Sequence, residues 1–216
     1  MQDFVSIFFR VIAVWLFLYL NWRNLRDNYE EKKLVVANWV GLLGFMLGAR
    51  LAYGFVNWGV WNSSVFDWWA FFSKPGMITS GGYVGFLLVT GAVSRINGWK
   101  YWSFLEDSVT AFLWFLICWK AGEGRFDLAW LLGEILLLLT LIICWFAAKK
   151  YRSFWWYKSG KKGFVFLTAN LIFGLGLLLV AFVLGHYQSQ MVFALMMVLL
   201  SVAGLFILGE VFKKGS

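Results

Sequence analysis

Residues 128–148, LAWLLGEILLLLTLIICWFAA, carry a single charged side chain, Glu134, in a run of 21 residues. A helix needs about 20 consecutive, mostly apolar residues to cross the hydrocarbon core of a bilayer. This stretch therefore predicts a transmembrane helix.

The composition also favours a membrane protein. Hydrophobic residues make up 62% of the chain and charged residues 14%, with one proline among 216 residues. A soluble domain carries roughly a quarter charged residues, so this chain has too few to cover a surface in water. Its length suits a single transmembrane domain over residues 1–216, which no linker or internal repeat divides.

Seven stretches are expected as transmembrane helices of an all-α, polytopic membrane protein. They are 4–20, 34–58, 81–95, 102–120, 128–148, 163–185 and 190–212. The first stretch lacks a basic start and a cleavage site, so we expect a retained helix rather than a secretory signal. Residues 59–80 are too polar to span, and we expect them at the outer surface or partly within the bilayer.

Basic residues concentrate in alternate connections between these stretches, and this predicts an orientation. The richer side holds Arg23, Arg26, Lys32, Lys33, Arg95, Lys100, Lys149, Lys150, Arg152, Lys158, Lys161, Lys162, Lys213 and Lys214. The poorer side holds Lys74, Lys120 and Arg125. Basic residues favour cytoplasmic loops, so the N-terminus is expected outside and the C-terminus in the cytoplasm. The net charge of +8 then reflects orientation and contact with anionic lipid, and no nucleic-acid partner is expected.

Two further groups of residues have simple structural explanations. Cys118 and Cys144 lie inside apolar runs, so they predict neither a disulfide nor a metal site, and no cofactor motif is present. Gly41, Gly44 and Gly48 share much of one helix face, which predicts close packing against another helix.

Several charged residues are expected inside the bilayer, where each costs roughly 3 kcal/mol. At 1.5 Å per residue, Arg10, Arg50 and Glu134 lie about 9, 12 and 10 Å from the outer ends of their helices. The turn over residues 120–127 adds four charged residues, which are Lys120, Glu123, Arg125 and Asp127. All of these charges fall in the outer half of the membrane.

This coincidence supports two interpretations. In the first, the charges line a polar pocket that opens outward and binds an anionic headgroup, for which the planar, permanently charged arginine fork is suited. In the second, Arg10 or Arg50 pairs with Glu134 to join helices or extends to the interface, and residues 120–127 form an ordinary solvated loop.

Glu106 and Asp107 enter the fourth stretch from the cytoplasmic side. Arg95 and Lys100 are close to them in the sequence, and we expect these two basic residues to neutralise them.

Two segments resemble motifs of the bacterial prolipoprotein diacylglyceryl transferases. LGARLAYGFVNW, residues 47–58, resembles their L-G-[GA]-R-[LI]-[GA]-Y segment, and PGMITSGGYVGF, residues 75–86, resembles their G-G-M-S-F-H-G-G-L-x-G signature. Asp107 and the Lys162-Gly163 pair are also similar to positions of the family. The resemblance is weak over nearly the whole chain and specific only in the two segments.

The resemblance implies an enzyme of the bacterial cytoplasmic (inner) membrane that needs no cofactor. Such enzymes move diacylglyceryl from phosphatidylglycerol to the lipobox cysteine of a preprolipoprotein, whose thiol attacks the glycerol carbon bearing the phosphate. On this hypothesis the substrate-binding residues are Arg10, Arg50, Tyr53, Gly81, Gly82, Lys120 and Glu134. The catalytic candidates of a rebuilt site are Ser80, Glu123 and Arg125.

The chain also departs from the family. Ser80 stands where the signature has histidine, Lys120 or Arg125 only approximates the arginine of a later motif, and the small head domain is missing. The alternative is therefore a catalytically inactive relative that binds phospholipid and serves other membrane proteins as a subunit or scaffold. A small-solute transporter is a more distant alternative, because the chain shows no inverted repeats.

Overall fold

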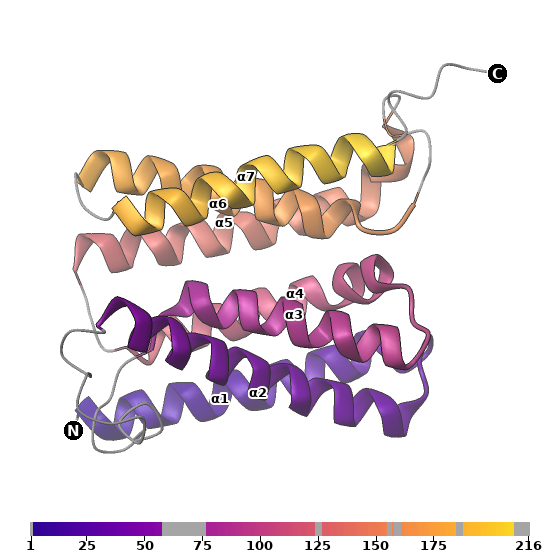
Figure 1. Cartoon of the computed structure of the whole chain (residues 1–216), viewed down its shortest axis with the longest axis horizontal. Helices are drawn as coiled ribbons and strands as arrows, with labels where there is room; N and C mark the ends of the chain where they lie inside the picture. Colours follow the sequence, from indigo (N-terminus) through magenta and orange to yellow (C-terminus); the bar gives the residue numbers. More distant parts are fainter. Residues whose placement is uncertain are drawn as a thin grey trace. The chain divides into compact units, whose positions relative to one another are not determined.

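The computed structural model describes residues 2–57, 77–123, 127–154, 157, 161–184 and 188–209. These residues form seven α-helices and one short 3-10 helix, and no strand occurs among them (Figure 1). The elements are α1 (Gln2–Leu25), α2 (Glu31–Val56), α3 (Thr79–Ile96), α4 (Tyr101–Ala121), α5 (Leu128–Lys150), η3 (Tyr151–Ser153), α6 (Phe164–Leu184) and α7 (Gln188–Gly209). Each helix overlaps one of the seven predicted stretches, so the all-α prediction is confirmed.

Five of the helices within the described residues are long and apolar enough to cross a membrane. They are α1, α2, α5, α6 and α7. Helix α3 has 18 residues and begins with Thr79, Ser80 and two glycines, while α4 contains Glu106, Asp107 and Lys120. Several apolar helices suited to a membrane protein are thus present, and the crossing by all seven stays a prediction.

Local sequence signals explain two of the helix ends. Helix α5 begins after Asp127, whose side chain accepts a hydrogen bond of 2.7 Å from the backbone N–H of Trp130. Such a cap satisfies one of the free N–H groups in the first turn. Helix α3 is followed by Gly98, whose φ of 69° lies in the left-handed region that glycine adopts without steric cost. Helix α3 therefore ends at this point.

The chain divides into two compact units. The first contains residues 1–25 and 102–216, and the second contains residues 26–101. The prediction of a single transmembrane domain is not tested by this division.

The second unit is built on a close contact between α2 and α3. A Cβ atom on Gly44 would lie 2.7 Å from the Val89 side chain and 2.9 Å from the carbonyl oxygen of Gly85. One on Gly48 would meet the carbonyl oxygen of Gly81. Small residues let helix backbones approach closely, so the predicted packing role of these α2 glycines is confirmed.

The first unit holds α1 and α4–α7. Helices α5, α6 and α7 pack side by side in chain order (Figure 1). On α1, Phe17 is fully buried, and its ring centroid lies 6.4 Å from that of Phe112 and 5.9 Å from that of Phe115, both on α4. Aromatic edge-to-face contacts of this kind fix α1 against α4.

Candidate functional site

Arg10 lies against the end of α4 in the first unit. The Ser6 hydroxyl donates a hydrogen bond to the carbonyl oxygen of Gly122, which holds α1 beside this end. The stem of Arg10 passes over Gly122, where an added Cβ would lie 3.1 Å from its Cγ. Its guanidinium carbon is 5.4 Å from the ring centroid of Trp119, within the range of a cation–π contact. The contacts with Gly122 and Trp119 thus hold the exposed Arg10 side chain across the C-terminal end of α4.

Lys120 joins the end of α4 to the beginning of α5. Its ammonium group lies directly over Gly133, in space that any larger residue would fill. The ammonium nitrogen is 3.4 Å from the carbonyl oxygen of Trp130, and the Trp130 indole N–H donates to the carbonyl oxygen of Lys120 at 3.0 Å. These reciprocal contacts hold the lysine in one place although its side chain is flexible.

Glu134 follows Gly133 on α5 and is 8% exposed. It is attracted electrostatically to Lys120 and repelled by Glu123. Its Oε1 atom has no hydrogen-bond partner among the described residues. A buried carboxylate oxygen without such a partner is costly unless a ligand or a proton satisfies it, so it is an expected feature of a functional site.

We call Arg10, Lys120, Glu123 and Glu134 the Lys120 cluster. They come from α1, the end of α4 and the beginning of α5, and all were singled out from the sequence. Arg10 lies against Trp119 and Gly122 in the described part of the chain, and the cation beside Glu134 is Lys120. Lys120, rather than Arg10, is therefore the cation that attracts Glu134, and the pocket that opens outward stays a prediction.

The remaining predicted residues of the described chain lie in the second unit. Arg50 is 3% exposed on α2, and its guanidinium carbon is 5.9 Å from the ring centroid of Tyr53. Ser80 is half-buried in the first turn of α3. Gly81 packs on the Ala52 side chain, and a Cβ on Gly82 would lie 2.7 Å from the Phe45 ring.

These two glycines thus have a packing explanation, and their predicted part in substrate binding stays a prediction. Arg125 lies outside the described residues, as does most of the predicted surface segment 59–80. Among the described residues, no three histidine, cysteine, aspartate or glutamate side chains gather closely enough to hold a metal ion.

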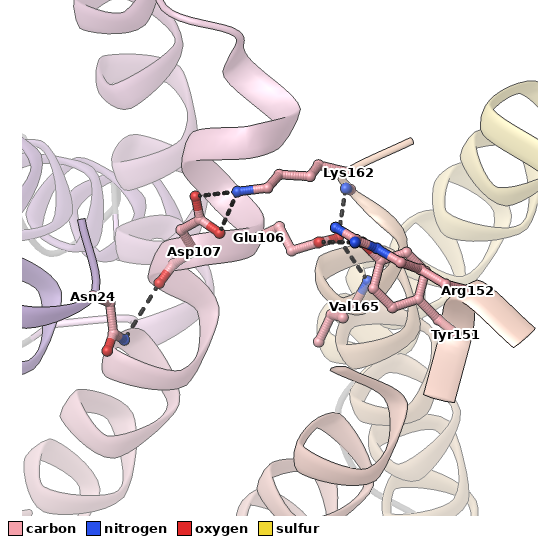
Figure 2. A network of polar contacts seen from close by, with 8 residues as sticks. Asn24, Glu106, Asp107, Tyr151, Arg152, Lys162 and Val165 are labelled. Atoms are coloured by element: carbon pink, nitrogen blue, oxygen red, sulfur yellow. Dashed lines mark hydrogen bonds and ion pairs between the residues drawn. The ribbon is translucent and has the colours of Figure 1, made fainter. Parts of the chain in front are cut away.

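A second polar network lies near the beginning of α4, as Figure 2 shows. Glu106 accepts hydrogen bonds from the backbone N–H groups of Gly163 and Val165 at 2.5 and 3.2 Å and from the Tyr151 hydroxyl at 3.2 Å. Asp107 pairs with Lys162 through contacts of 3.0 and 2.8 Å. Glu106 therefore caps the first turn of α6, where free N–H groups favour a carboxylate.

This network corrects the expectation that Arg95 and Lys100 would neutralise the two acids. Asp107 instead pairs with a lysine 55 positions away in the sequence, and Glu106 is stabilised mainly by backbone N–H groups. Sequence proximity pointed to the wrong cations because helix packing decides which loops meet. The available signal was the similarity of both Asp107 and Lys162-Gly163 to positions of one family.

The sequence was also compared with models of known protein families and with curated proteins. Neither comparison finds a match.

Proposed function

We propose that this chain is a seven-span protein of the bacterial cytoplasmic membrane, with its N-terminus outside, whose Lys120 cluster binds an anionic phospholipid headgroup. Helices α3 and α4 have 18 and 21 residues, which correspond to about 27 and 31 Å at 1.5 Å per residue. These lengths suit a hydrocarbon core about 30 Å thick. With all seven helices spanning, the excess of basic residues falls in the cytoplasm and the Lys120 cluster lies in the outer leaflet.

The observation that carries this proposal is the convergence of charged residues from three helices at one end of the first unit. Arg10 presents an exposed planar fork, and Lys120 is held over Gly133 beside the buried Glu134. A phosphate group would accept charge-assisted hydrogen bonds from both cations. In the protein alone, the negative charge of Glu134 attracts the Lys120 ammonium group. Phosphatidylglycerol is the lipid that the resemblance implies.

Diacylglyceryl transfer is the second candidate function. The observation that favours it is the buried Glu134 side chain, whose Oε1 atom has no hydrogen-bond partner among the described residues. A carboxylate with a free oxygen beside a cation is a reasonable general base, which is the role that Ser80 cannot fill alone. The thiol proton would pass to Glu134 as the sulfur bonds to the glycerol carbon. The bond from that carbon to the phosphate oxygen breaks, and glycerol phosphate leaves with its charge held by Lys120 and Arg10.

One assay separates transfer from binding alone. The purified protein is incubated with phosphatidylglycerol and a lipobox peptide, and mass spectrometry measures both bound lipid and thioether product. We expect phosphatidylglycerol to co-purify with the wild type and to be depleted in Lys120→Met, with Lys32→Met, an exposed lysine elsewhere, as the control.

Product that is lost in Glu134→Gln supports the transferase. Bound lipid without product supports the inactive relative, acting as a subunit or scaffold for other membrane proteins. Equal phosphatidylglycerol in the wild type and Lys120→Met contradicts both forms of the proposal.

A further inference from the structure

One acid of the Lys120 cluster has an oxygen that the protein itself leaves unused. Glu134 is 8% exposed and lies with Gly133 and Leu137 on the buried side of α5. Its Oε1 atom is buried and has no hydrogen-bond partner among the described residues. A buried carboxylate oxygen in this state raises the free energy of the folded protein, because its hydrogen bonds to water are lost. Glu134 therefore presents a strong acceptor that a ligand can use.

Glu106, in the same unit, shows how the chain satisfies another acid. Its side chain is half-buried, and both of its carboxylate oxygens accept hydrogen bonds (Figure 2). The donors are the Tyr151 hydroxyl and the backbone N–H groups of Gly163 and Val165. The more deeply buried Glu134 is thus the acid with an unused oxygen, which sets it apart from an ordinary structural acid.

Lys120 compensates the charge of Glu134 without bonding to this oxygen. The lysine attracts the carboxylate electrostatically, but Oε1 accepts no hydrogen bond from it. The ammonium group instead lies over Gly133, 3.4 Å from the carbonyl oxygen of Trp130. The Trp130 indole N–H is also engaged, because it donates to the carbonyl oxygen of Lys120 at 3.0 Å. Glu134 therefore lacks a hydrogen-bond donor rather than a counter-charge.

This difference decides which headgroup chemistry fits. An ammonium group on the lipid would bring a second cation close to Lys120, and like charges repel each other. A hydroxyl group donates a hydrogen bond without adding charge. In phosphatidylglycerol the hydroxyl groups lie on the second and third carbons from the phosphate, so a phosphate bound at Lys120 brings them into the region of Glu134.

We infer that Glu134 determines the specificity of the Lys120 cluster by accepting a hydrogen bond from a hydroxyl group on the headgroup of an anionic phospholipid. The inference rests on the proposed function, because the bound phosphate positions the hydroxyl group. It goes further, because phosphate binding alone does not distinguish headgroups of equal charge. A site built to bond a hydroxyl group discriminates against the analogue that lacks it, since its own buried polar group is then left unpaired.

Two phosphodiesters of equal charge test this inference on the full chain. Phosphatidylglycerol carries headgroup hydroxyls, and phosphatidylpropanol has the same three-carbon headgroup without them. Native mass spectrometry measures the affinity of the purified protein for each lipid in the absence of peptide, so that transferase chemistry does not contribute. We expect the wild type to bind phosphatidylglycerol about tenfold more tightly, which corresponds to one charge-assisted hydrogen bond.

Variants identify the acceptor. Glu134→Met removes the acceptor with little change in side-chain length, and the affinity ratio of the two lipids should fall to about one. Glu134→Gln keeps an uncharged acceptor and should give an intermediate ratio. Glu31→Met, at an exposed position on α2, is the control and should keep the wild-type ratio. A partial loss of folding lowers both affinities together, so the ratio still reports on specificity.

Two results overturn the inference. One is equal affinity of the wild type for both lipids. The other is a wild-type preference that persists in Glu134→Met, which would place the acceptor at another residue. In either case the proposed function stands if both affinities fall in Arg10→Met/Lys120→Met. If neither affinity depends on Arg10 and Lys120, the proposed function itself fails.

Discussion

Lys120 occupies space that exists only because Gly133 has no side chain. The neighbouring Glu134 is buried, so removing the lysine would leave its carboxylate without the cation that attracts it. Breaking one side of a buried charged pair costs more than removing both sides, since the remaining charge is stranded. The stability of the cluster should therefore depend on its two members jointly.

We predict that Lys120→Met lowers the free energy of unfolding by about 1–3 kcal/mol, less than for a fully buried pair because Lys120 is half-buried. Lys120→Met/Glu134→Gln should recover most of this loss. Thermal unfolding in detergent, followed by circular dichroism, measures both, with Lys32→Met as the control. A double variant whose loss equals the sum of the single losses would show that the two residues are not coupled.

Glu106 provides a second test at the scale of single residues. Glu106→Ala leaves the N–H groups of Gly163 and Val165 without this acceptor, and each unsatisfied group costs about 1–3 kcal/mol. Tyr151→Phe removes one hydrogen bond to the same carboxylate and should cost about 1 kcal/mol. We therefore predict a larger fall in unfolding temperature for Glu106→Ala. An equal or larger effect of Tyr151→Phe would contradict the capping role.

At the scale of elements, the contact between α2 and α3 depends on glycine at particular positions. A Cβ on Gly85 would meet the carbonyl oxygen of Gly44 and lie 2.9 Å from the Cα of Gly48, so it presses on backbone. Gly91, on the same helix, offers a matched control, because its added Cβ would lie 3.5 Å from the Tyr101 ring. The two positions share a helix and differ in the space available.

We predict that Gly85→Ala destabilises the protein by about 1–3 kcal/mol through overpacking. Gly91→Ala should be neutral or stabilising by up to about 1 kcal/mol, because alanine is the better helix former. Unfolding in a series of denaturing detergent concentrations compares the two. Equal effects would mean that the close approach of α2 and α3 does not matter for stability.

The helices were the most predictable part, because continuous apolar runs identify them directly. The residues at which the helices begin and end were less predictable. Helix α1 continues to Leu25, five residues beyond the predicted stretch, because Asn21 and Arg23 extend the helix without extending the apolar run. The grouping of Lys120 with Glu134 followed from adjacent helices joined by a short turn. The capping of α6 by Glu106 could not be predicted in this way, because it depends on contacts between segments that are far apart in the sequence.

At the scale of the whole molecule, the basic residues predict which connections face the cytoplasm. A cysteine introduced at Ser153 should react with an impermeant reagent only after the cells are opened. A tag at the N-terminus should be digested from outside. In intact cells, we expect the tag to be digested and the cysteine to remain unlabelled. The reverse pattern would invert the orientation and move the Lys120 cluster to the inner leaflet.

The Lys120 cluster is proposed to bind an anionic phospholipid headgroup. Native mass spectrometry of the wild type, titrated with phosphatidylglycerol and separately with phosphatidylcholine, measures this most directly. We predict preferential binding of phosphatidylglycerol that weakens at least tenfold in Arg10→Met/Lys120→Met and is unchanged in Lys32→Met/Lys33→Met, since two charge-assisted contacts of about 1.5 kcal/mol or more would be lost. Equal affinity of the wild type and Arg10→Met/Lys120→Met for phosphatidylglycerol would contradict the claim.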